Sequence, residues 1–222
     1  MTLLAVLLAL AAPQAQSIDD VQSPKIDAAF QSITAGRPQE ALDALAPVIV
    51  AYEADQAKEK RHLYCGMSVA ETIAYMALPD PDKKGAVALA PGYCTALYLK
   101  GFALIDLNRI ADARAVYLRV VSLAPFHAHF LSELGQSYRY DKNWPMMLDS
   151  CKRAEGVVGF ASDESRKKET ALAWHCQGYA LTELGKLDEA EKLYRQCLEL
   201  DPDDAHAKNE LLYIAERRKK TT

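Results

Sequence analysis

The chain has 222 residues, of which half are apolar and a quarter are charged, and its formal net charge is -4. This balance suits a globular α-helical protein and argues against nonspecific binding to nucleic acid. Beyond the first residues, no stretch is long and apolar enough to cross a membrane.

The N-terminal residues 1–16 resemble a cleavable export signal. An uninterrupted apolar run covers residues 3–12, too short to span a bilayer as a helix, and it ends in small residues of the A-x-A type. Residues 1–16 carry no charged side chain, so the basic start typical of such signals is missing. We predict an exported protein, periplasmic or secreted. An uncleaved anchor and a cytoplasmic segment are the alternatives.

A first helical hairpin is predicted over residues 24–53. Ser23 and Pro24 form a favourable helix start, with a capping hydroxyl followed by a proline in the first turn. Pro47 falls within the second helix and is expected to kink or end it.

Residues 54–92 are predicted to form a second, degenerate hairpin. Their frame is less regular, because the proline-rich segment 78–82 interrupts it. The prediction for these residues is therefore a helical pair with a distorted turn.

Three further segments share one register. Equivalent positions recur at 34 residues, as between Gly101 and Gly135, and Gly135 to Gly178 adds nine residues to that period. The extra residues lie around 159–170 and predict a lengthened first helix. We assign hairpins to residues 94–127, 128–161 and 171–204. A final amphipathic helix over 205–220 is expected to cap the last of them.

The register is defined by residues with distinct packing tasks. Glycines and alanines allow two helices to cross closely, aromatic residues fill the gaps, and prolines end the second helix. These repeat-defining residues are Gly101, Ala113, Tyr117, Pro125, Gly135, Trp174, Gly178, Ala190, Tyr194 and Pro202. Their spacing resembles that of the tetratricopeptide repeat family across about residues 24–220. The resemblance implies an all-α, right-handed solenoid of about five antiparallel helix hairpins with a capping helix.

The resemblance also implies a concave groove lined by the first helix of each hairpin, which holds a peptide or a partner helix. Rings supply contact area there, and a guanidinium supplies a planar set of donors. The candidates for this groove are Tyr98, Phe102, His129, Gln136, Arg139, Tyr140, His175 and Tyr179. Packing between neighbouring helices is the alternative for Phe102 and Tyr179. The Lys and Asn clamp of chaperone-binding members is absent from the matching positions, which disfavours binding to a chaperone C-terminus.

The five cysteines are Cys65, Cys94, Cys151, Cys176 and Cys197. Export would place them in an oxidising compartment, but their odd number leaves at least one free or paired between chains. The repeat geometry makes a disulfide that involves Cys176 conceivable, because Cys197 lies on the other helix of the same hairpin and Cys151 on the second helix of the preceding one. Burial as small apolar side chains is the alternative, and the sequence does not decide the pairing.

The pair His127 and His129 raises the question of a metal site. His175 on the next first helix is the candidate for a further ligand, but no third ligand is assured. We predict no metal or other cofactor.

No hydrolase, phosphate-binding or metalloprotease motif occurs. The sequence therefore favours a non-enzymatic adaptor or scaffold of the cell envelope whose partner is a protein or peptide, not nucleic acid. A cytoplasmic regulatory scaffold is one alternative. A redox- or metal-responsive protein that uses its Cys and His residues is another.

Overall fold

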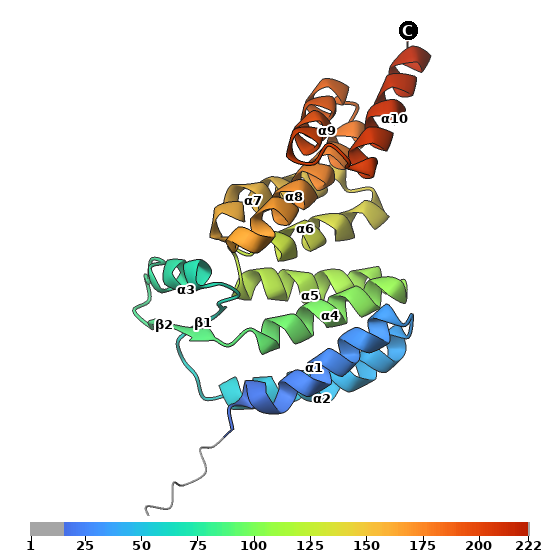
Figure 1. Ribbon diagram of the computed structural model, residues 1–222. Helices are drawn as coiled ribbons and strands as arrows, with labels where there is room; N and C mark the ends of the chain where they lie inside the picture. Colours follow the sequence, from blue (N-terminus) through green and yellow to red (C-terminus); the bar gives the residue numbers. More distant parts are fainter. Residues whose placement is uncertain (1–15, 222) are drawn as a thin grey trace, which may run out of the picture.

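The computed structural model describes residues 16–221, and these residues form a stack of helical hairpins (Figure 1). The N-terminal part contains α1 (Ile18–Thr34), α2 (Pro38–Gln56), β1 (His62–Cys65), α3 (Val69–Met76) and β2 (Ala86–Leu89). The middle contains α4 (Gly92–Asp106), α5 (Ile110–Leu123), α6 (Ala128–Ser137), η1 (Tyr138–Asp141) and α7 (Trp144–Val157). The C-terminal part contains η2 (Val158–Phe160), α8 (Asp163–Glu183), α9 (Leu187–Leu200) and α10 (Ala205–Thr221).

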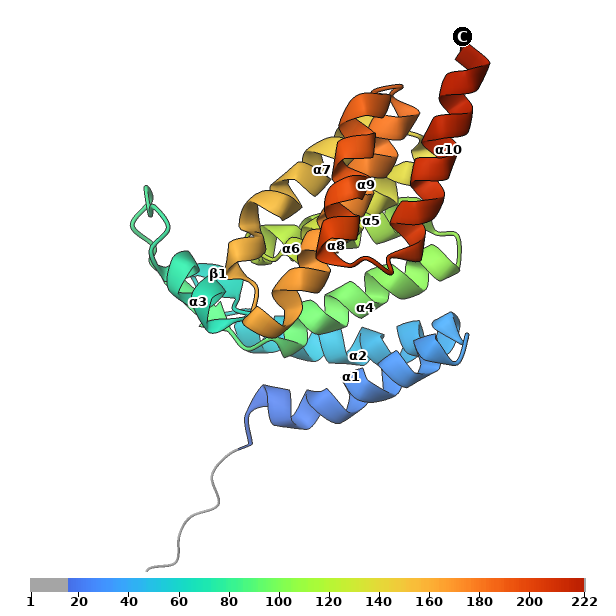
Figure 2. The same cartoon turned by 45° about the horizontal axis from the view of Figure 1, so that its top comes forward.

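The helices pair as α1–α2, α4–α5, α6–α7 and α8–α9, and α10 packs against α9 and α8 at the C-terminal end (Figure 2). Each pair buries its apolar stripes against the next, so one continuous core runs through the stack. The all-α helical repeat solenoid predicted from the sequence is confirmed. The predicted signal over residues 1–16 lies almost entirely outside the described residues.

The first helix begins six residues earlier than the sequence predicted. Ser17 and Asp20 form a capping box, in which the Ser17 hydroxyl accepts the Asp20 N–H at 3.1 Å and the Asp20 carboxylate accepts the Ser17 N–H at 3.0 Å. Pro24 therefore lies inside α1 and not at its start. The helix tolerates the missing N–H of this proline because its buried face packs on α2.

The sequence also predicted that Pro47 would kink or end the second helix, and the helix does not end there. Helix α2 continues past it to Gln56. Val48, Ile49 and Tyr52 follow the proline and are all buried in the core, so tertiary packing holds the last turns in helical form.

Residues 54–92 do not form the predicted hairpin. They contain the end of α2, then β1, the short helix α3 and β2, and the two strands pair in parallel with Leu63 opposite Val87. The stack within residues 16–221 therefore has four hairpins where the sequence predicted about five. Pro79 and Pro81 prevent a second long helix after α3, and the positive φ of Gly85 turns the chain into β2 instead.

This β1–α3–β2 insertion projects from one side of the stack (Figure 1). Four aromatic rings join it to the hairpins: Tyr64 stacks on Tyr75, Tyr75 on Phe126 and Phe126 on Phe160, with centroids 5.0–5.3 Å apart. The Tyr75 hydroxyl accepts the Phe126 N–H at 3.2 Å, and the Ser68 hydroxyl donates to the Phe160 carbonyl at 2.8 Å. The insertion is thus fixed to the turns that follow α5 and α7.

Two disulfides cross-link the stack. Cys65 of β1 is bonded to Cys94 of α4, with Cα atoms 6.2 Å apart, and Cys151 of α7 is bonded to Cys176 of α8, with Cα atoms 5.8 Å apart. The second contains Cys176, for which the repeat geometry made a disulfide conceivable without deciding its partner. Cys197 of α9 is a free, buried cysteine.

Candidate binding groove

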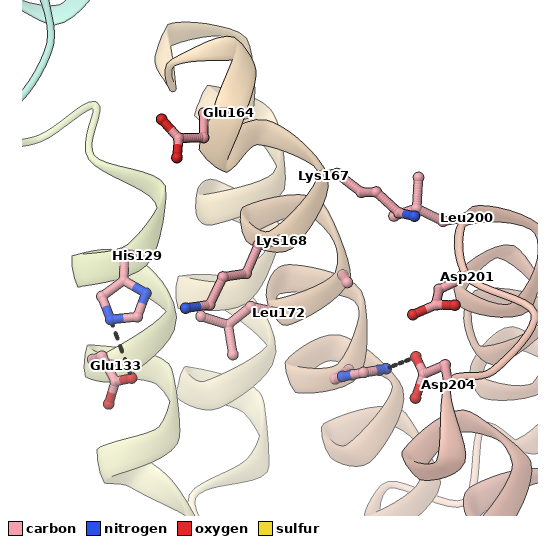
Figure 3. A pocket seen from close by; sticks show the side chains of 11 residues that line it. His129, Glu133, Glu164, Lys167, Lys168, Leu172, Leu200, Asp201 and Asp204 are labelled. Carbon is pink, nitrogen blue, oxygen red and sulfur yellow. Dashed lines mark hydrogen bonds and ion pairs between the residues drawn. The ribbon is translucent and has the colours of Figure 1, made fainter. Parts of the chain in front are cut away.

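A groove of about 580 Å³ lies between α6, α8 and the turn that joins α9 to α10 (Figure 3). It is therefore bounded by the first helices of the last two hairpins. Its walls consist of His129 and Glu133 of α6, six residues of α8, and the α9–α10 connection. The lining residues beyond α6 are Glu164, Lys167, Lys168, Ala171, Leu172, His175, Leu200, Asp201 and Asp204.

A second hollow of about 290 Å³ extends the groove toward the N-terminal hairpins. It shares His129 and Lys168 with the larger one, so the two are continuous. Tyr98 of α4, Phe130 of α6 and Glu169 of α8 belong to this part. The first helices of three successive hairpins therefore face one extended surface.

His129 stands at the junction of the two hollows. Its Nε2 is 3.0 Å from the Tyr98 hydroxyl and 3.6 Å from Glu133 Oε1, and its Nδ1 is 3.6 Å from Glu169 Oε2. Burial by itself lowers the pKa of His129. The adjoining carboxylates of Glu169 and Glu133 outweigh that effect and hold the pKa above its ordinary value, although the nearby Lys168 opposes them.

The pKa of Glu133 is also raised, but here burial is the main cause. Removal of its carboxylate from water raises its pKa, the positive charge of His129 lowers it, and the charge of Glu169 raises it further. Lys168 extends from α8 toward His129 and Glu133 across the groove (Figure 3). The junction thus contains two carboxylates, an imidazole and an ammonium group.

The C-terminal end of the groove contains a second polar cluster. His175 Nε2 of α8 lies 2.6 Å from Asp204 Oδ2, and Asp204 Oδ1 accepts the N–H of Ala207 in α10. The His206 ring lies 4.5 Å from the His175 ring, centroid to centroid. Behind them is the free Cys197, whose thiol has its pKa raised to about 12 by burial.

The structure separates the candidate groove residues into two sets. Tyr98, His129 and His175 line the hollows just described. The others, Phe102, Gln136, Arg139, Tyr140 and Tyr179, do not line either of them. Among these, the Arg139 guanidinium lies 4.5 Å above the centre of the Tyr179 ring, and that ring meets Trp144 edge to face. A role for this second set in partner binding stays a prediction.

Sequence reasoning missed most of the charged lining, notably Glu164, Lys168 and Asp204. The reason is that α8 is longer than the corresponding helices, so its first turns have no equivalent in the repeat frame. A helical period was available as a signal, because residues 164, 168, 171 and 175 recur at intervals of three and four and share one face.

The histidine pair noted in the sequence does not converge. Both line the second hollow, but His127 Nδ1 contacts the buried Glu71 of α3 at 2.8 Å, whereas His129 Nε2 lies 3.0 Å from the Tyr98 hydroxyl. Within residues 16–221, two other groups bring three potential metal ligands together: His175 with Cys197 and Asp204, and His62 with Asp80 and Asp82. None of the helices in this part of the chain combines the length and apolarity that a bilayer crossing needs.

Comparison with known proteins supports the repeat assignment. Tetratricopeptide repeat family models match residues 95–127 and 171–204. No curated protein matches the chain.

Several solved structures share the fold at low sequence identity. MamA from Desulfovibrio magneticus RS-1 is 18% identical with a TM-score of 0.59, over 91% of this chain and 88% of MamA. A putative kinesin light chain of Podospora anserina with TPR-like repeats is 14% identical with a TM-score of 0.61, over 93% of this chain and 90% of that one. The first TPR domain of human RPAP3 is 24% identical with a TM-score of 0.50, over 57% of this chain and 93% of the domain. Residues 95–127 and 171–204 thus match tetratricopeptide repeat models, and the chain shares its helical solenoid fold with these structures.

Proposed function

We propose that the protein is a non-enzymatic adaptor whose groove binds an extended peptide or a helix of a partner protein that presents basic side chains. The observation that carries this proposal is the charge of the groove. Carboxylates outnumber lysines on its walls, and they come from α6, α8 and the α9–α10 turn: Glu133, Glu164, Glu169, Asp201 and Asp204, against Lys167 and Lys168.

The shape of the groove supports a peptide ligand. At about 580 Å³, the larger hollow lies within the range of about 300–1,000 Å³ that is typical of ligand sites, and the second hollow continues it across three hairpins. Leu172 and Leu200 are apolar residues of its wall, and Leu172 lies between Glu133 on one side and Asp204 on the other (Figure 3). A segment with an apolar residue between basic residues is complementary to that order.

A related domain helps to define the ligand by contrast. The first TPR of RPAP3, which shares the fold, is described as bound to the HSP90 peptide SRMEEVD. That peptide has consecutive glutamates and a terminal aspartate, and the carboxylates of the present groove would repel them. The proposed ligand is therefore of opposite charge to that of the RPAP3 domain.

We further propose that the adaptor acts outside the cytoplasm, in the cell envelope. The apolar segment near the N-terminus has the pattern of an export signal, and two disulfides cross-link the fold. Cell fractionation with N-terminal sequencing of the mature protein tests this location. Recovery of the protein from the soluble cytoplasm with Met1 intact would refute it.

A displayed library of random linear peptides tests the ligand class. Selection on the purified protein is expected to enrich peptides with Lys or Arg on both sides of an apolar residue. Their affinity is expected to fall as salt is added, because the ion pairs lie at the surface of an open groove.

Matched variants assign that binding to the groove. The double change Glu133→Gln and Glu164→Gln removes two of the groove's negative charges. It is expected to weaken the binding of a selected peptide on the order of 10-fold, which corresponds to about 1.4 kcal/mol. The control is Glu189→Gln, on the exposed surface of α9 outside the groove. Enrichment of acidic peptides, or equal affinity for both variants, would contradict the proposal.

A further inference from the structure

The last hairpin brings together three side chains of different chemistry, two of which also line the groove. His175 of α8, Cys197 of α9 and Asp204 of the α9–α10 turn place one nitrogen, one sulfur and one oxygen atom within 4.8 Å of one another. The three residues belong to three different elements, so the group exists only in the folded chain. His175 and Asp204 line the groove, and Cys197 closes the site from the core side.

We propose that His175, Cys197 and Asp204 bind one divalent transition-metal ion, with Zn²⁺ the best match. Imidazole nitrogen, thiolate sulfur and carboxylate oxygen are the three ligand types that zinc takes from proteins, and its structural and catalytic sites are usually tetrahedral. Three protein ligands leave the fourth position for water or for His206, whose ring lies 4.5 Å from that of His175.

The geometry needs only small adjustments. Bond lengths of about 2.0–2.3 Å place two ligand atoms of a tetrahedral zinc site roughly 3.3–3.8 Å apart. His175 Nε2 and Asp204 Oδ2 are at 2.6 Å, so they separate slightly when an ion replaces the hydrogen between them. Binding breaks that hydrogen bond and forms three metal–ligand bonds. The imidazole binds as the neutral tautomer with its proton on Nδ1, so the Nε2 proton moves to Nδ1 through solvent, and the Cys197 thiol proton is released to solvent.

The residues at these three positions can be compared with those at the equivalent positions of the other two hairpins in register. Packing alone is satisfied by apolar residues at the positions equivalent to Cys197, which are Val120 in α5 and Ala154 in α7, both fully buried. The positions equivalent to His175 are occupied by Tyr98 and Ser132, and those equivalent to Asp204 by His127 and Ala161. Among the three hairpins in register, only the last therefore combines three ligands of this kind.

The site is also reachable and selective. The groove gives an ion direct access to His175 and Asp204, which form part of its wall (Figure 3). The other four cysteines are consumed in disulfides, which leaves Cys197 as the thiol available for a metal. A sulfur ligand favours Zn²⁺ over Mg²⁺ and Ca²⁺, which prefer oxygen ligands.

Cobalt substitution in the full mature chain, free of affinity tag and with its disulfides intact, tests the proposal. The protein is stripped with a chelator and titrated with Co²⁺, which reports its ligands by absorption. We expect one ion per chain, a thiolate-to-cobalt charge-transfer band in the near ultraviolet and visible bands of a four-coordinate ion. Zn²⁺ is expected to displace the cobalt. Absence of the charge-transfer band in the folded wild-type protein overturns the proposal.

Variants identify the ligands. Cys197→Ala, which restores the residue found at Ala154, is expected to abolish the charge-transfer band and to weaken Zn²⁺ binding by at least about 100-fold, beyond the 10–100-fold typical of outer-shell changes. His175→Gln is expected to weaken Zn²⁺ binding comparably. His62→Ala disrupts the exposed group of His62, Asp80 and Asp82 and serves as the matched control, with no expected effect. Circular dichroism verifies folding, and Cys197→Val provides a second packing variant. A band that survives both Cys197 variants, or that His62→Ala removes, refutes the site.

Discussion

The close approach of α8 and α9 at Gly178 gives a quantitative test of the structure. A methyl group added at Gly178 would meet three ring carbons of Tyr194 at 2.7, 2.9 and 3.0 Å. Carbon atoms pack favourably at about 3.5–4.0 Å, so the ring or the helix has to move by roughly 0.8 Å. Tyr194 is fully buried, which leaves its ring no free space to move into.

The expected change in stability follows from two opposing effects. Overpacking of a core costs about 1–3 kcal/mol, whereas replacing a helical glycine by alanine gains about 1 kcal/mol. Because three atoms of a rigid ring are involved, we expect Gly178→Ala to lower the free energy of unfolding by about 1–2 kcal/mol. For a chain of this size, that corresponds to a fall in Tm of about 2–8 °C. Urea unfolding followed by circular dichroism measures the free energy.

Gly156 in α7 provides the matched control. A methyl group added there meets nothing within 4 Å, so Gly156→Ala is expected to raise the stability by up to about 1 kcal/mol. In a Tyr194→Leu background, the penalty for Gly178→Ala should vanish, because the smaller side chain leaves room for the methyl group. If Gly178→Ala stabilises the protein as Gly156→Ala does, the helices are farther apart than the structure shows.

Three further outcomes are expected. Replacing Cys65 and Cys94 together by alanine should lower the free energy of unfolding by about 2–4 kcal/mol, since the disulfide closes a loop across a sequence separation of 29. Thiol titration of the unfolded, unreduced wild-type chain should find one free thiol. Tyr117→Phe should leave the Tm unchanged or raise it, because the buried Tyr117 hydroxyl has no hydrogen-bond partner within residues 16–221; a clear fall in Tm would show that it has one. Because the pKa of His129 is raised in the folded state, its protonation should stabilise the fold. That stabilisation is complete below the unfolded pKa of about 6.5 and is lost as the pH rises through the folded pKa. In NMR titrations, Glu169→Gln should lower the pKa of His129, and an unchanged pKa would disprove the contact between the two side chains.

The sequence by itself determined the repeat architecture from residue 94 onward. Helical hairpins at a period of 34 residues need small residues where helices cross and aromatic residues beside them, and these requirements are local enough to be read from spacing. The same register made a disulfide that involves Cys176 conceivable, because it places the helices of Cys151 and Cys197 beside α8, but it did not decide between those two partners. The polar, ionic character of the groove did not follow, because the first turns of α8 stand outside the repeat.

Only the tertiary structure decided what residues 54–92 do. The strands His62–Cys65 and Ala86–Leu89 pair although they are far apart in sequence, and neither segment has a sequence pattern that identifies the strand it pairs with. The disulfide between Cys65 and Cys94 was hidden for the same reason. The meeting of His175, Cys197 and Asp204 likewise depends on how α8, α9 and the following turn pack. Spacing along a chain specifies neighbours within a helix or a repeat, whereas contacts between elements depend on the three-dimensional path of the chain.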